Sequence, residues 1–143
     1  MIRKRSLFVD TSGWLIYIGK DELYHQEVVA IYRDYIRRKR LIVTTSYIIA
    51  ELTTLATSRG VISHQQILDF IERISSNPLI EIVHIDASLY QAALALLKAR
   101  ADKQWSLADA ASFVVMQQRG ITEALTLDKH FVQAGFVRLP KQE

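Results

Sequence analysis

The sequence contains no cysteine, and this absence excludes several kinds of chemistry at once. Disulfide frameworks, thiolate zinc sites, iron–sulfur clusters and a cysteine nucleophile all need the missing thiol. Glycine and proline are scarce, with 5 and 2 residues in 143, so the composition is neither collagen-like nor of low complexity. A chain without cysteine also fits the reducing cytosol. We therefore expect a globular core that needs no cross-links.

Long hydrophobic runs and a strong excess of one charge are absent as well. The apolar stretch behind the basic N-terminus ends at Asp10 after three residues, which is too short for the core of a signal peptide. No run approaches the ~18 apolar residues of a membrane-spanning helix. Lys and Arg number 18 against 15 Asp and Glu, and a net charge of +3 is too small to identify a partner. We therefore expect a cytoplasmic protein that makes no membrane contact.

Strand-like and helix-like patterns alternate along the 143 residues, a length typical of one domain. Continuous β-branched runs indicate buried strands, and apolar residues at three- and four-residue spacing indicate helices. We predict one α/β domain over residues 1–143, with three layers (α/β/α) around a mostly parallel sheet of four or five strands. The predicted strands are 7–9, 41–44, 80–85, 124–127 and 136–138; the predicted helices are 22–39, 46–60, 63–76, 87–101, 106–118 and a short one before the last strand; residues 11–13 are expected to turn the chain.

Two of the predicted strands end in aspartates, Asp10 and Asp128. Ligands of open parallel sheets bind beyond the carboxyl ends of the strands, so both residues are candidates for a functional site. Aspartate in front of a helix also caps its free N–H groups. For either residue taken alone, capping and function are equally good explanations.

Asp109 and Glu51 are two further candidates. Ser106 and Asp109 fit a capping box, which by itself would explain both residues. Glu51 lies at the margin of an apolar helical stripe, where we expect it to be partly buried and to need a cation, either an arginine or a metal ion.

The four acids are more informative together than singly. Carboxylates in one pocket raise one another's pKa, and a bound divalent cation relieves the repulsion. All-oxygen ligands favour Mg²⁺ or Mn²⁺ over zinc. Such a centre suits hydrolysis of phosphodiester bonds, since it activates water and stabilises the leaving oxygen.

The four acids lie in four short segments: Phe8–Trp14, Ile49–Leu52, Asp102–Phe113 and Leu125–Phe131. In this order, the segments resemble the acidic motifs of PIN-domain ribonucleases. The ordered set covers nearly the whole chain, and the third segment is the most specific. The resemblance implies a PIN-like fold and RNA cleavage that depends on Mg²⁺ or Mn²⁺. At this length, the chain looks most like a VapC-type toxin of a toxin–antitoxin pair, which implies a cognate antitoxin protein and a homodimer.

The same resemblance implies roles for single residues. The acidic metal pocket would consist of Asp10, Glu51, Asp109 and Asp128, with Asp10 and Asp109 as the surest direct ligands. Hydroxyl positions beside the pocket match Ser12 and Ser106, although capping is the better explanation for Ser106. Lys103 and Lys129 adjoin acidic motifs and are candidates for contacts to RNA phosphates.

Other conspicuous residues have simpler interpretations. The cations of 37–40 complement a helix C-terminus, and Trp14 and Trp105 are expected in the core or at an interface. The four histidines lack metal-ligand spacing such as H-x-x-x-H, so His130 is expected on a helix surface.

Three alternative functions differ in what they require. A haloacid-dehalogenase-type phosphatase needs an acid where this chain has Ser12. A receiver domain would use Asp86 as phosphate acceptor, but it needs an acidic neighbour for Asp10. The main alternative is a PIN-like module that binds RNA or a protein without cleaving.

Overall fold

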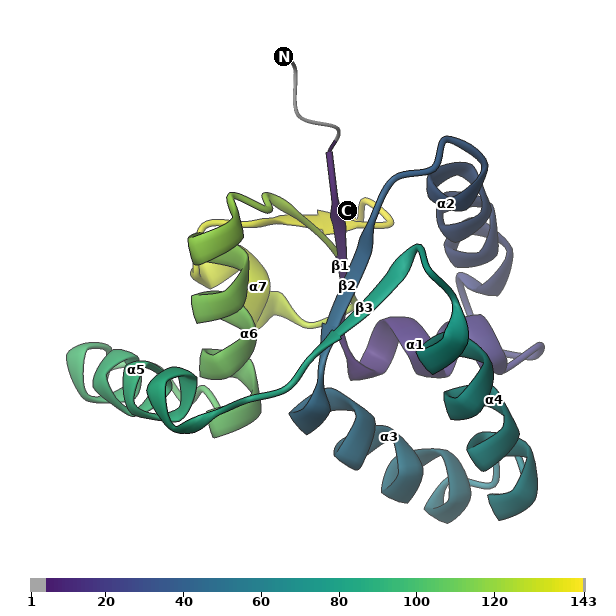
Figure 1. Cartoon of the computed structure of the whole chain (residues 1–143), viewed down its shortest axis with the longest axis horizontal. Coiled ribbons are helices and arrows are strands. Elements are labelled where there is room, and N and C mark those ends of the chain that lie inside the picture. The colour runs from purple at the N-terminus through teal and green to yellow at the C-terminus, as the bar shows by residue number, and fades with distance from the viewer. Residues whose placement is uncertain (1–4, 143) are drawn as a thin grey trace.

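The structure, a computed structural model, describes residues 5–142. A sheet stands in the centre of the molecule and helices cover both of its faces (Figure 1). The elements in chain order are β1 (Leu7–Val9), α1 (Thr11–Ile18), α2 (His25–Arg37), β2 (Ile42–Thr45), α3 (Ser46–Ser58), α4 (His64–Ser76), β3 (Ile80–Val83), α5 (Ala87–Ala99), α6 (Leu107–Arg119), β4 (Glu123–Leu125), α7 (Lys129–Gln133) and β5 (Val137–Leu139).

The sheet has the strand order β3-β2-β1-β4-β5, and every neighbouring pair is parallel. Helices α1 to α4 lie on one side of the sheet in Figure 1, and α5 to α7 lie on the other. The chain therefore builds outward from β1 to β3 and then crosses over to add β4 on the opposite side of β1. The direction of winding reverses between β1 and β4, and the carboxyl ends of strands at such a reversal flank a crevice where ligands bind.

The central strand β1 is completely buried, as a strand covered by helices on both faces must be. Trp14 and Trp105 belong to the core, with 0% and 7% exposure, which confirms their interpretation as packing residues. Their indole N–H groups donate to Thr44 Oγ1 and Gln133 Oε1, so neither ring leaves a buried donor unpaired.

Residues 11–18 form helix α1, so the turn predicted at 11–13 is wrong. The helix is apolar on nearly all sides after Gly13 and therefore lacks the stripe that identifies a surface helix. Gly13 lets α1 begin close to β4, because a Cβ atom there would overlap the backbone carbonyl of Leu125. This close approach brings the end of β1 next to the segment that follows β4.

Two smaller predictions also need correction. Helix α3 begins at Ser46 as predicted; Ser46 had suggested itself as the N-cap, but the cap is Thr45, and the Ser46 hydroxyl instead accepts a hydrogen bond from the backbone N–H of Ile85. Strand β4 ends at Leu125, so Asp128 follows it after two residues instead of directly. In residues 5–142 we find no helix with the length and hydropathy needed to cross a bilayer.

Candidate active site

Asp10 is the most buried carboxylate of the site, with 7% of the residue exposed. It caps α1: Oδ1 accepts from the Gly13 N–H at 2.9 Å and from the Ser12 hydroxyl at 2.8 Å. Oδ2 accepts from the Thr126 hydroxyl at 2.7 Å. Burial raises the pKa of Asp10 to about 6, against the three hydrogen bonds that lower it, and the charge of Asp128 raises it further. Asp10 therefore caps helix α1 and also lies close enough to Asp128 to be affected by its charge.

Thr126 links the strand ends and was not singled out in the sequence. Its side chain is 1% exposed, and its hydroxyl also accepts from the backbone N–H of Asp128 at 2.9 Å. The Ser12 hydroxyl accepts from the N–H of Leu127 at 3.0 Å, so the two hydroxyls tie the segment after β4 to the start of α1. The sequence offered one sign of this role, namely a hydroxyl residue between the apolar Leu125 and Leu127.

Asp109 forms the predicted capping box at the start of α6. Its N–H donates to the Ser106 hydroxyl, and its Oδ2 accepts from the Ser106 N–H, both at 3.0 Å. This confirms capping as the contact made by Ser106. The same Oδ2 atom is also 2.9 Å from Nδ1 of His130, so the carboxylate serves the helix and faces the site at once.

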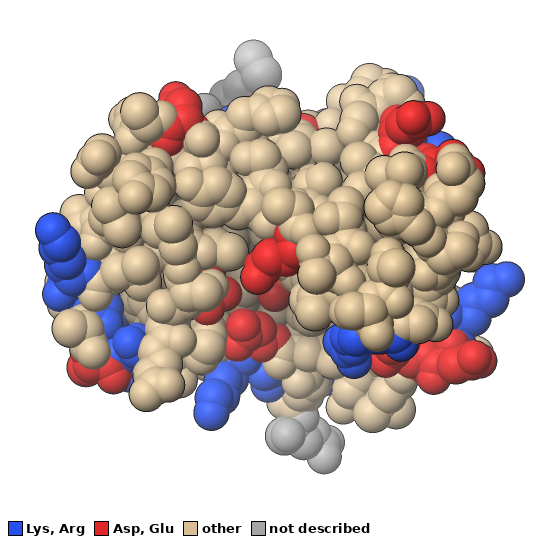
Figure 2. Space-filling view, turned by 90° about the horizontal axis from the view of Figure 1, so that it is seen from below, with Lys and Arg blue, Asp and Glu red and all other residues tan. Residues whose placement is uncertain are grey.

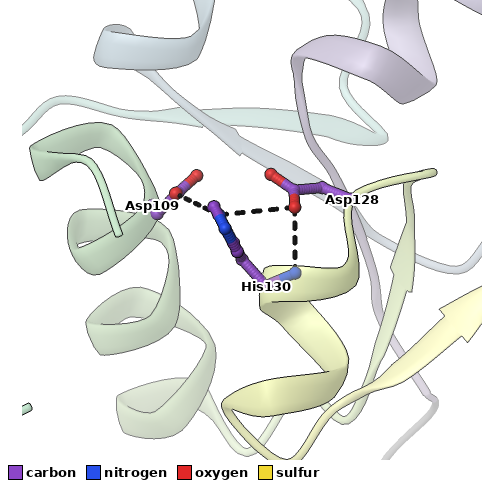
Figure 3. Close-up of side chains that lie close together, drawn as sticks. All are labelled: Asp109, Asp128 and His130. Atoms are coloured by element: carbon purple, nitrogen blue, oxygen red, sulfur yellow. Dashed lines mark hydrogen bonds and ion pairs between the residues drawn. The ribbon is translucent and has the colours of Figure 1, made fainter. Parts of the chain in front are cut away.

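His130 lies between Asp109 and Asp128 (Figure 3). Asp128 caps α7 by accepting from the His130 backbone N–H at 2.9 Å, and its Oδ1 is 3.4 Å from His130 Nδ1. The interpretation of His130 as a plain surface histidine is therefore wrong. The spacing of histidines along the chain could not predict this contact, because Asp109 belongs to a different helix. The D-x-H pattern of Asp128 and His130 was the only part of the group present in one short segment.

Glu51 is exposed on α3, contrary to the partial burial expected from its place beside the apolar stripe. The hydroxyl of Thr11 donates to its Oε1 at 2.9 Å. The pKa of Glu51 is nonetheless raised, first by partial desolvation and then by the negative charges of Asp109 and Asp128. Glu51 is thus exposed to solvent, and yet the charges of two other acids raise its pKa.

The structure brings the four predicted acids to the carboxyl-end face of the sheet. Acidic atoms gather near the centre of this face, and Lys and Arg side chains lie nearer its rim (Figure 2). Within the described range 5–142, one group of three or more candidate ligands has all its donor atoms within 4.8 Å of one another: Asp109, Asp128 and His130. Asp10 and Glu51 adjoin this group without belonging to it.

The charges of these acids are not neutralised by basic side chains. In the part of the chain that the structure describes, the four acids make no ion pair with Lys or Arg, and His130 is the base within ion-pair distance of Asp109 and Asp128. Carboxylates that lie close together without an ion pair to Lys or Arg favour a bound metal ion. The oxygen donors of the four acids fit Mg²⁺ or Mn²⁺.

The basic candidates differ in their surroundings. Lys129 is exposed at the start of α7, beside Asp128. Lys103 contacts Asp102 at 3.6 Å and keeps 30% of its side chain exposed. The cations at the C-terminus of α2 lie at the other end of the sheet, where Arg37 and Arg38 pair with Asp34. This supports their interpretation as cations of a helix C-terminus.

Comparison with known proteins identifies the family. Residues 7–137 match the family model of the PIN domain. The chain belongs to the PIN-domain family. The resemblance inferred from the four acidic motifs is thereby confirmed, and so is the PIN-like fold with its parallel sheet.

Two known proteins resemble this PIN domain. The 23S rRNA-specific endonuclease VapC20 from two strains of Mycobacterium tuberculosis is 26% identical over 133 residues, which cover 93% of this chain and 97% of VapC20. The crystal structure of M. tuberculosis VapC20, described as a Sarcin-Ricin loop cleaving toxin, superimposes with a TM-score of 0.80 over 92% of this chain and 96% of VapC20. FitAcB from Neisseria gonorrhoeae shares the fold, with a TM-score of 0.62 and 19% identity over 92% of this chain and 95% of its own.

Proposed function

We propose that this PIN-domain protein is an endoribonuclease that hydrolyses RNA phosphodiester bonds with the help of Mg²⁺ or Mn²⁺. The observation that carries the proposal is the group of acids without Lys or Arg partners at the point where the sheet reverses its winding. The similarity to VapC20, which is itself an RNA endonuclease, supports it.

The site contains residues that would bind the cation and residues that position these ligands by hydrogen bonds. Asp10, Glu51, Asp109 and Asp128 would hold the ion, and donor atoms of Asp109 and Asp128 already lie within 4.8 Å of each other. Ser12 and Thr126 fix the carboxylate of Asp10, and Ser106 fixes that of Asp109. When bound, the cation supplies the positive charge that activates water and stabilises the phosphate oxygens.

The reaction that fits this arrangement is an in-line displacement at phosphorus. A water oxygen forms a bond to phosphorus, the bond from phosphorus to the 3′ oxygen breaks, and a proton ends on that oxygen. The products carry a 5′-phosphate and a 3′-hydroxyl. Lys103 and Lys129 adjoin the acidic motifs and would contact RNA phosphates.

The biological role that we propose is the toxin of a toxin–antitoxin pair. VapC20 is named a toxin and covers the same length, so ribosomal RNA is the first substrate to test. A toxin of this kind requires an antitoxin protein that blocks the acidic face, and we propose that it acts as a homodimer in the cytoplasm, where its RNA substrate is found.

A cleavage assay with purified protein tests the activity. Ribosomes and total RNA are incubated with the wild-type protein and with Asp109→Asn, in Mg²⁺, Mn²⁺ or EDTA, and new 5′ ends are sequenced. We expect discrete 5′-phosphate ends with the wild type in either cation, and none with EDTA or the variant. RNA binding without cleavage, unchanged by EDTA, would instead establish the non-catalytic module.

A further inference from the structure

The imidazole of His130 occupies a place that the proposed mechanism leaves without a role. Nδ1 is 2.9 Å from Asp109 Oδ2 and 3.4 Å from Asp128 Oδ1, so one nitrogen faces both carboxylates (Figure 3). The side chain is 25% exposed, about as accessible as the two acids it contacts. The nitrogen is therefore aimed into the acidic group rather than into bulk water.

The spacing of the three donor atoms matches that of neighbouring ligands on one cation. Ligands at about 2.1 Å from an octahedral ion lie roughly 3 Å from each other. The two distances from Nδ1 are close to this value, and all three donor atoms lie within 4.8 Å of one another. A cation bound by both carboxylates would therefore lie within reach of the imidazole nitrogen.

The backbone around His130 is fixed on both sides. Its N–H is capped by Asp128, one of the two acids in question. The next residue, Phe131, is 1% exposed and packs in the core against Phe113, which follows Asp109 on α6, with ring centroids 4.9 Å apart. The elements that carry Asp109 and His130 are thus held together by the core beneath the site.

We propose that His130 is a nitrogen ligand of the metal centre, alongside Asp109 and Asp128, and that it makes the site prefer Mn²⁺ over Mg²⁺. The inference rests on the proposed metal dependence and adds the identity of a ligand and the choice of ion. Mg²⁺ is bound almost wholly by oxygen, whereas imidazole suits transition metals. A site with one nitrogen therefore selects Mn²⁺ more strongly than carboxylates alone would.

Loss of activity alone cannot separate this role from that of a residue that only positions Asp109, because either change weakens the site. Direct detection of the bond can. The protein is loaded with one equivalent of Mn²⁺, and pulsed electron paramagnetic resonance records the coupling of the metal to nitrogen. Protein labelled with ¹⁵N-histidine assigns any coupling to imidazole, and His130→Gln removes the proposed ligand. His64→Gln is the matched control, since His64 is an exposed histidine at the start of α4.

We expect histidine coupling in the wild type and in His64→Gln, and its loss in His130→Gln. Calorimetric titration should show Mn²⁺ binding about tenfold weaker in His130→Gln, with Mg²⁺ binding changed much less. Circular dichroism and thermal unfolding establish that the variant is folded, and His130→Asn serves as a second variant if it is not.

Absence of histidine coupling in the wild type overturns the inference, and so does coupling that survives in His130→Gln. An equal loss of Mn²⁺ and Mg²⁺ affinity overturns the proposed preference and assigns His130 to positioning. If RNA is cleaved while the coupling is absent, the proposed function stands and the ligand role fails. If the coupling is present while no RNA is cleaved, the ligand role stands and the proposed function fails.

Discussion

The hydroxyl of Thr126 donates to Oδ2 of Asp10 at 2.7 Å, across 116 positions of sequence. The bond joins the end of β1 to the segment after β4, at the reversal of the strand order. Thr126 also accepts from the N–H of Asp128. One buried hydroxyl therefore holds two of the four acids in place.

Thr126→Val tests this role with a side chain of the same shape. We expect its free energy of unfolding to fall by about 1–3 kcal/mol, because buried hydrogen-bonding groups lose their partner. RNA cleavage should fall at least tenfold, since the positions of Asp10 and Asp128 are no longer fixed. Thr126→Ser keeps the hydroxyl and should retain most of the cleavage rate. Equal losses in both variants would point to packing of the methyl group instead.

The raised pKa of Asp10 predicts how stability depends on pH. Because the pKa is about 6 in the folded protein and 3.8 ordinarily, the folded state binds more protons in this interval. The free energy of unfolding therefore falls as pH rises from about 4 to 6, by at most ~3 kcal/mol from this group. Asp10→Asn removes the buried charge and should be more stable than the wild type at pH 7 by about 1–3 kcal/mol, with no difference near pH 4.

Urea unfolding in EDTA at several pH values measures this effect for the metal-free protein. Asp86→Asn is the control, because Asp86 is an exposed cap of α5. If the difference in stability between Asp10→Asn and the wild type is the same at pH 7 and at pH 4, burial of the charge does not destabilise the protein. Asp10→Asn should also cleave no RNA although it is folded.

Lys129→Ala tests the proposed contact with RNA phosphate. We expect a several-fold rise in KM with kcat nearly unchanged, and a weaker dependence of RNA binding on salt, since one phosphate contact is lost. Lys39→Ala removes the same charge at the other end of the sheet, between α2 and β2, and should change neither quantity. Equal effects of the two variants would mean that net charge alone governs binding.

Gly13→Ala tests the close approach of α1 to β4. Its Cβ atom would overlap the carbonyl of Leu125, so we expect a loss of about 2–3 kcal/mol in the free energy of unfolding. Gly60→Ala meets no atom within 4 Å but has a φ of +68°, and it should cost about 1 kcal/mol. Chemical denaturation of both variants compares steric overlap with backbone strain. A smaller loss for Gly13→Ala would show that α1 can move away from β4.

Local patterns in the sequence were sufficient for much of this protein. The alternation of strands and helices led to the parallel sheet, because hydrophobic periodicity reflects which faces are buried. The capping box of Ser106 and Asp109 was also predictable, since its hydrogen bonds span three residues. The order of the four acidic motifs identified the PIN family before any contact between them was known.

Other features were decided only by the tertiary structure. The strand order places Thr126 against Asp10, and the packing of α6 beside α7 places His130 against Asp109, 21 positions earlier in the chain. Helix α1 escaped detection because burial on nearly all sides leaves no periodic pattern. Glu51 is exposed although Ile48 and Leu52 on the same helix are buried. The sequence by itself determined which residue types and local turns were present. Which of them share one pocket depended on the winding of the sheet, because hydrogen bonds between distant residues form only once the strands have taken their order.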